Sequence, residues 1–159
     1  MMKRLKNLFI FSGLLLLVNC DNNNTAGEAI DFQNRLVEVV NTNDYSGNQS
    51  IAFGELTTFK WDSVHIFGPY TPSDIIFKRL GFRWDKVEDL SIQSDEINNL
   101  LVFTRQNKLV EYVEYPRYKG DFINLDLPQT FSVEEANFVI KEEYYGSQKW
   151  LFFYPKIKN

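Results

Sequence analysis

A short apolar segment that ends at a single cysteine constrains this chain more than any other feature of its sequence. Lys3, Arg4 and Lys6 form a basic head, and an eleven-residue, mostly apolar run from 8 to 18 follows, just ahead of Cys20. A bilayer-spanning helix needs about 20 apolar residues, so this run is short for a membrane span. A basic head and an apolar stretch of about 7–15 residues are typical of a secretory signal. We therefore expect residues 1–19 to be removed as a signal peptide.

The junction at Cys20 resembles the end of a bacterial lipoprotein signal peptide. Leu17 matches the aliphatic residue usual three positions before the cysteine, Val18 fits the pattern, and Asn19 departs from the small residue usual just before it. The resemblance implies that the Cys20 thiol receives a diacylglyceryl group, whose two chains hold a protein to a membrane without a transmembrane helix. It also implies an extracytoplasmic location on the cell membrane or the outer membrane. The alternative is an uncleaved anchor with an incidental cysteine.

The chain beyond the signal has the size and the composition of one folded domain. Residues 20–28 are predicted to be the lipidated cysteine and a flexible tether, because they contain little apolar surface. Residues 29–159 are predicted to form a single globular domain. With Cys20 lipidated, no disulfide can form, so a core must hold the fold. All three Trp, all eight Tyr and twelve of the fourteen Phe lie after the signal, and this aromatic content favours a β-rich fold.

The mature chain is acidic. Fourteen of the seventeen Lys and Arg lie beyond the signal beside all twenty-one Asp and Glu, so the net charge is −7 when His65 is neutral. This charge argues against nucleic acid or an anionic membrane surface as a partner, because both require basic patches. One His and one lipidated Cys are too few for a zinc site, and neither a calcium loop nor a phosphate-binding glycine loop is present. We therefore expect no metal and no cofactor.

Two helices are predicted from apolar spacing and end signals. The first covers residues 28–41, and its expected core side consists of Ile30, Leu36, Val37 and Val40. The second covers residues 72–80, where Thr71 is expected to cap the first turn, Asp74 to return the bond, and Gly81 to end the helix in the left-handed conformation. Its expected buried side consists of Ile75, Ile76 and Leu80.

Strands are predicted from alternation, β-branched and aromatic residues, and turn signals. They are expected at residues 56–67, 100–105, 108–115, 122–127, from 137 to the turn at 146–148, and at 150–154. The segment 56–67 is apolar on both sides, which predicts a central strand. Residues 133–144 also fit a helix, and the run Phe138-Val139-Ile140 favours the strand. The prediction is a single α+β domain with two helices on an antiparallel sheet of about five strands.

Two segments carry candidate chemistry. The stretch from Phe59 to Pro72 resembles one in small uncharacterised bacterial lipoproteins, where a Trp-Asp pair precedes a strand and a Pro-Tyr-Thr-Pro turn. That resemblance implies no activity, and we interpret the segment as scaffold, with a binding site as the alternative. Ser63 and His65 lie two apart on the predicted strand, where their side chains diverge, and no nucleophile-elbow motif is present. We expect His65 to be partly buried and hydrogen-bonded.

The tyrosines indicate a recognition surface, because Tyr brings contact area with a polar handle. The predicted surface consists of Tyr112, Tyr115, Tyr118, Trp61 and Tyr70. The alternative is a sheet whose second face is half covered. The sequence thus predicts a non-enzymatic, lipid-anchored envelope protein that binds another protein or a glycan. The first alternative is an inhibitor or immunity protein against an envelope enzyme or toxin, and the second is an unrecognised hydrolase.

Overall fold

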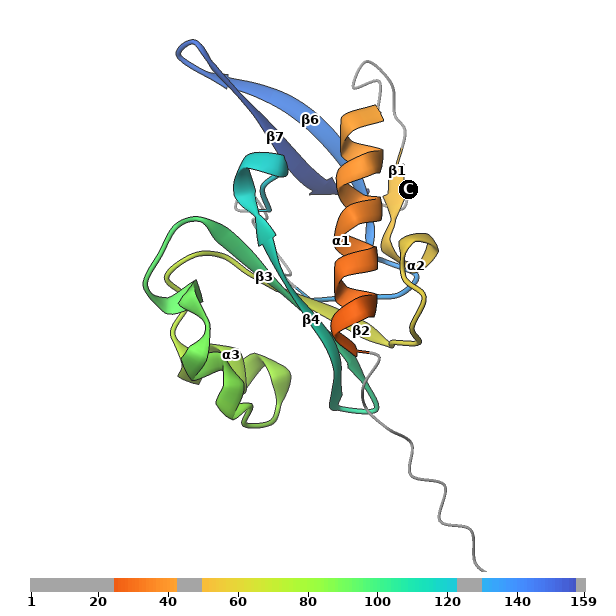
Figure 1. The fold of residues 1–159 in the computed structure, drawn as a ribbon, viewed down its shortest axis with the longest axis vertical. Coiled ribbons are helices and arrows are strands. Elements are labelled where there is room, and N and C mark those ends of the chain that lie inside the picture. Colours follow the sequence, from red (N-terminus) through yellow and green to blue (C-terminus); the bar gives the residue numbers. More distant parts are fainter. Residues whose placement is uncertain (1–24, 43–49, 123–129, 157–159) are drawn as a thin grey trace, which may run out of the picture.

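Two antiparallel sheets and a long helix make up this α+β protein (Figure 1). The computed structural model describes residues 25–42, 50–122 and 130–156. One sheet has the order β4-β3-β2-β5, with β2 at Ser63–Phe67, β3 at Asn98–Arg105, β4 at Lys108–Pro116 and β5 at Thr130–Ser132. The other has the order β1-β6-β7, with β1 at Ser50–Ala52, β6 at Asn137–Tyr145 and β7 at Gln148–Pro155.

The helices are one long element and several short ones. They are α1 (Thr25–Thr42), α2 (Phe53–Leu56) and α3 (Ser73–Leu80), with the 3-10 helices η1 (Asp85–Asp89), η2 (Ser91–Gln93) and η3 (Arg117–Lys119).

The predicted α+β class is confirmed, and the predicted single sheet of about five strands is wrong. Strands β1 and β5 have three residues each, which is too short for alternation to reveal them, and β1 pairs with β6 in a separate sheet.

Helix α1 lies where the first helix was predicted, but it is longer and buries a different face from the predicted one. It begins at Thr25, so the last four residues of the predicted tether 20–28 are helical. Its buried side is Phe32, Leu36 and Val40, spaced four residues apart. Ile30, which was expected to face the core, is 59% exposed. The reason is that the large ring of Phe32 occupies the centre of the buried stripe.

Helix α3 has its predicted end but not its predicted cap. The hydroxyl of Thr71 donates a hydrogen bond to the carbonyl of Gly68 at 2.6 Å and does not cap the helix. The N–H of Ser73 in the first turn donates instead to the side-chain oxygen of Gln93 at 3.3 Å. Gly81 has φ 79°, so the left-handed end is confirmed. The expected buried side holds except at Ile75, which is exposed.

The predicted hairpins are confirmed, and the predicted strand 56–67 is shorter than expected. Gln106 and Asn107 have φ 51° and 57°, which forms the tight turn between β3 and β4. The strand from 137 is also confirmed as β6, paired with β7. Only Ser63–Phe67 of 56–67 is a strand, and it is central, between β3 and β5. The predicted strand 122–127 lies outside the described residues except for Phe122, and Cys20 also lies outside them.

The aromatic residues form the core. Strand β3 buries both of its faces, with Leu101 and Phe103 toward α1 and Leu100 and Val102 toward α3. The ring of Phe103 meets those of Phe32, Phe59 and Trp61 edge to face, with centroids 5.1–5.2 Å apart. Edge-to-face pairs of this kind add to the stabilisation from apolar burial.

A buried ionic network joins the two sheets. Asp121 is 1% exposed, and its carboxylate accepts hydrogen bonds from the side chains of Asn99 on β3 at 3.1 Å and Arg117 on η3 at 2.9 Å. Its backbone N–H donates to the carbonyl of Leu151, and its carbonyl accepts from the N–H of Phe153, both on β7. The network thereby links β7 to the start of β3 and to η3 at the end of β4.

Candidate functional site

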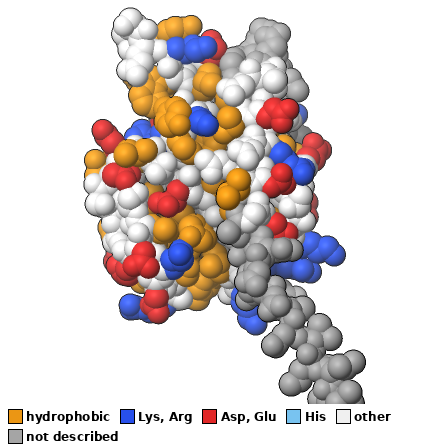
Figure 2. Space-filling model, viewed as in Figure 1, with side chains coloured by type: hydrophobic (Ala, Val, Ile, Leu, Met, Phe, Trp, Pro, Cys, Tyr) orange, Lys and Arg blue, Asp and Glu red, His pale blue; other side chains and the backbone are white. Residues whose placement is uncertain are grey.

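A groove of about 600 Å³ lies between α1 and the outer strand of the four-stranded sheet. Ala29, Ile30 and Gln33 of α1 line it together with residues 111–114 of β4 and Lys86 of η1. We call it the α1–β4 groove. In the view of Figure 2, apolar side chains gather between the α3 region and the lower part of α1, with single acidic and basic residues among them. Such a mixture of apolar walls and a few polar groups is typical of ligand sites.

The register of β4 explains how the groove reaches both faces of the sheet. Phe103 pairs with Glu111, and the next residue, Thr104, pairs with Leu109, so Val110 is an extra residue that forms a β-bulge. Beyond the bulge, side chains alternate: residues 111, 113 and 115 face α1, and residues 112 and 114 face the other side. Since the groove contains residues 111–114, it wraps the free edge of β4.

Glu111 is the buried acid of this groove. It is 4% exposed, and one carboxylate oxygen accepts a hydrogen bond from the N–H of Tyr112 at 2.9 Å. Its other oxygen, Oε2, has no hydrogen-bond partner among the described residues. Burial raises the pKa of Glu111, the bond from Tyr112 lowers it, and the negative charge of Glu28 raises it further. A buried carboxyl with an unsatisfied oxygen is costly, which marks the position as one that gains from an added donor.

The apolar walls of the groove come from Ile30 and Tyr112. Ile30 projects from α1 into solvent, as its exposure shows. Tyr112 packs edge to face on Trp84, with ring centroids 5.0 Å apart, and is held in place by that contact. Lys86 brings the one positive charge that lines the groove among the described residues.

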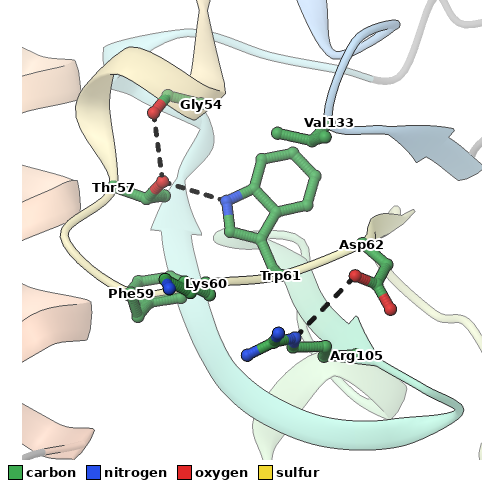
Figure 3. Close-up of a pocket in the computed structure, with 8 residues that line it drawn as sticks. All are labelled: Gly54, Thr57, Phe59, Lys60, Trp61, Asp62, Arg105 and Val133. Atoms are coloured by element: carbon green, nitrogen blue, oxygen red, sulfur yellow. Dashed lines mark hydrogen bonds and ion pairs between the residues drawn. The ribbon is translucent and has the colours of Figure 1, made fainter.

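A second, smaller pocket of about 340 Å³ lies beside Trp61 (Figure 3). The indole N–H of Trp61 donates to the hydroxyl of Thr57 at 2.9 Å, and Arg105 approaches Asp62 to 4.0 Å. The Asp62 carboxylate also accepts a hydrogen bond from the N–H of Gln106 at 2.8 Å, which holds the β3–β4 turn. Trp61 itself is buried against Phe103. These bonds are all used to hold the local fold together, so we assign this pocket a structural role.

The structure does not gather the five residues of the predicted recognition surface at one place. Tyr112 lines the α1–β4 groove, and Trp61 lines the second pocket. Tyr118 and Tyr70 are exposed, on η3 and before α3 respectively. Tyr115 is fully buried, and its hydroxyl donates to the carbonyl of Lys119 at 3.1 Å. Tyr115 therefore does not belong to any exposed surface, because it lies on the side of β4 that faces the core.

His65 is buried and hydrogen-bonded as expected. Its Nδ1 lies 3.1 Å from the hydroxyl of Thr130, and its Nε2 lies 3.2 Å from that of Thr104. Burial, and secondarily the charge of Arg79, lower the pKa of His65 to about 4. With both ring nitrogens bonded to threonines, His65 is not placed as a base for Ser63, and neither residue lines the two cavities described above. This geometry argues against a Ser63–His65 nucleophile.

Alternation in β4 was the signal that could have revealed Glu111. The positions 111, 113 and 115 read Glu, Val and Tyr, so the acid stands in the apolar half of an alternating strand. The prediction from the tyrosines included Tyr112 and not the neighbouring Glu111.

In the described ranges, no group of three or more acidic, His or Cys side chains is placed to hold a metal ion. None of the helices in these ranges combines the length and apolar character needed to cross a bilayer.

Comparison with known proteins returned no match: no family model, no curated protein and no solved structure is significantly similar to this chain.

Proposed function

We propose that this chain is a non-enzymatic, lipid-anchored protein of the cell envelope that binds another macromolecule through the α1–β4 groove. The lipoprotein-like junction at Cys20 supports the anchor. The groove supports the binding role, because it combines an exposed isoleucine, a braced tyrosine and a buried carboxyl with a free oxygen. That combination at one cavity is the single observation on which the binding role depends.

The short distance in sequence between anchor and groove also supports the proposal. Helix α1 begins at Thr25, five residues after Cys20, and an extended chain spans at most roughly 3.3–3.6 Å per residue. A lipid on Cys20 would therefore hold the first turns of α1, which carry Ala29 and Ile30, close to the membrane surface. The groove would meet partners that are themselves at or near the membrane.

The anchor is tested by the intact mass of protein purified from its native host. We expect loss of residues 1–19 and a mass increment on Cys20 that matches a diacylglyceryl group. A Cys20→Ser variant should keep its leader and lose the increment. An unmodified Cys20 with the leader still attached would contradict the anchor and leave the groove unaffected.

The binding role is tested by photocrosslinking in intact cells, with benzoylphenylalanine placed at Ile30. Ile97, which is 58% exposed and does not line the groove, is a matched control for Ile30, which is 59% exposed. We expect a discrete crosslinked product from position 30 and none from position 97. Products from both positions at equal yield, or from neither, would contradict a binding role for the groove.

A further inference from the structure

The outer edge of β4 offers main-chain groups in addition to the side chains of the groove. β4 is the terminal strand of its sheet. The N–H of Tyr112 donates to the side chain of Glu111, so it points away from β3. Because successive residues of a strand alternate in direction, the N–H and carbonyl of Glu114 point outward as well. Pro116, which has no N–H to offer, occupies the next outward position, as is usual at a sheet edge.

The charged residues of the groove create a negative electrostatic environment. Glu111 is buried and has one unpartnered oxygen, and no ion pair among the described residues includes it. Glu114 lines the groove from the other face of β4, and the negative charge of Glu28 is close enough to raise the pKa of Glu111. Lys86 is the basic residue of the lining. The groove therefore has more negative than positive charge, and it favours a cationic group.

We propose, building on the binding role above, that the α1–β4 groove receives an extended peptide segment of a partner protein that carries a lysine or arginine. Its main chain pairs with the outward carbonyl of Tyr112 and the outward N–H of Glu114, as an added strand of the sheet. Its cationic side chain reaches the carboxylate of Glu111 and supplies the donor that Oε2 lacks in the free protein.

Extended peptides fit this edge better than other acid-seeking ligands do. A free amine or a metal ion would use the carboxylate and leave the edge of β4 unpaired. A strand uses both, and the exposed Ile30 and the ring of Tyr112 give its side chains apolar contacts on either side of that edge. Glu111 also occupies the N–H of Tyr112, so any added strand pairs with fewer main-chain groups at this edge, and the ion pair of a cationic strand with Glu111 adds to that limited pairing.

The experiment uses two blocked pentapeptides, acetyl-Val-Thr-Lys-Thr-Val-amide and the same peptide with norleucine in place of lysine. Each is titrated into ¹⁵N-labelled protein covering residues 20–159, and amide shifts are followed. We expect saturable binding of the lysine peptide and at least tenfold weaker binding of the norleucine peptide, a difference of about 1.4 kcal/mol or more. The amide of Glu114 should move downfield, and that of Val113, which is directed toward β3, should move little.

A substitution at Glu111 tests the contribution of its carboxylate separately from that of the other groove residues. E111Q should weaken the lysine peptide about tenfold and leave the norleucine peptide unchanged, whereas E88Q, an exposed glutamate outside the groove, should change neither. If E111Q unfolds, the pKa of Glu111 in the wild-type protein is measured instead. The lysine peptide should lower that pKa, and the norleucine peptide should not.

Three results would overturn the inference: no saturable shift with the lysine peptide up to roughly 10 mM, equal affinity for both peptides, or a Glu111 pKa that the lysine peptide leaves unchanged. Its failure can be told from failure of the proposed function. A crosslink from position 30 without peptide binding would keep the groove as a binding site and reject an extended cationic segment as its ligand.

Discussion

At the scale of single residues, the buried polar side chains are the positions where the protein depends on solution conditions. His65 lies between two threonine hydroxyls, 3.1 Å from Thr130 and 3.2 Å from Thr104. The hydroxyl of Thr104 also donates to the carbonyl of Ser63, so it accepts from Nε2–H, and Nδ1 accepts from Thr130. This arrangement suits a neutral imidazole, since a protonated ring would need two acceptors.

Acidification should therefore destabilise the protein through His65. Its folded-state pKa is about 4, below the unfolded value of 6.5, so the unfolded chain binds more protons between these values. Stability is full above about pH 6.5 and falls as the pH approaches 4, by up to about 3 kcal/mol at 1.4 kcal/mol per pKa unit. Urea unfolding at pH 7 and pH 4.5 measures the change.

A variant isolates the contribution of His65 from that of other groups. Glu111 acts in the opposite direction, because its raised pKa makes the folded state bind the extra proton as the pH falls. His65→Gln retains hydrogen-bonding capacity without titrating, so it should lose less stability than the wild type between the two pH values. Equal losses in both proteins would rule out His65 as the cause.

At the scale of elements, α1 shows that packing against the sheet, and not apolar spacing alone, decides which side of a helix is buried. The predicted helix exists, but its buried side is set by Phe32, whose ring contacts those of Phe53 and Phe103 at centroid distances of 5.3 and 5.1 Å. Ile30 was a sound candidate for the core on spacing alone, since hydropathy does not say which of several apolar stripes meets a partner. The sheet beneath α1 decides that, and it leaves Ile30 for the groove.

Alanine substitutions in α1 should reproduce this difference. Phe32→Ala removes a fully buried ring and should lower the free energy of unfolding by about 3–5 kcal/mol. Ile30→Ala removes an exposed side chain and should change it by no more than about 0.5 kcal/mol. Thermal or urea unfolding of the two variants gives the comparison. A large loss with Ile30→Ala would mean that α1 is rotated from the orientation described above.

At the scale of the whole molecule, the Asp121 network adds a polar link between the two sheets to the aromatic core that they share. Arg117 forms an ion pair with Asp121 at 2.8 Å and donates a hydrogen bond to the carbonyl of Glu96 at 2.8 Å. The Cζ atom of its guanidinium also lies over the ring of Trp150, 5.9 Å from the ring centroid. One arginine thus contacts the three-stranded sheet and the approach to β3. No short-range pattern predicts this, because the partners are distributed from residue 96 to residue 150.

Removal of the arginine should weaken the molecule as a unit. Arg117→Met removes the cation that pairs with the buried carboxylate of Asp121 and should cost about 3–5 kcal/mol of unfolding free energy. Arg35→Met, which breaks the exposed pair with Asp31, should cost far less. Adding Asp121→Asn to Arg117→Met should recover part of the loss, because it also removes the buried negative charge that Arg117 balances. No recovery would indicate that Arg117 acts through packing rather than through charge.

Local signals were sufficient for much of the fold. The left-handed Gly81, the turn at Gln106 and Asn107, and the pairing of β6 with β7 arise from residues close together in the chain, because turns and short hairpins are governed by local backbone preferences. The expectation of a lipid anchor also comes from a local pattern that ends at Cys20.

Tertiary structure alone decided the rest. The division into two sheets arises because β6 pairs with β1 and β7 and with no described strand of the other sheet, a choice of partners that the strands' own sequences do not set. The burial of Tyr115, the exposure of Ile30 and the free oxygen of Glu111 depend on which face of β4 meets α1. A residue's type sets the cost of its burial, and only the packing of the remaining chain determines whether that cost arises.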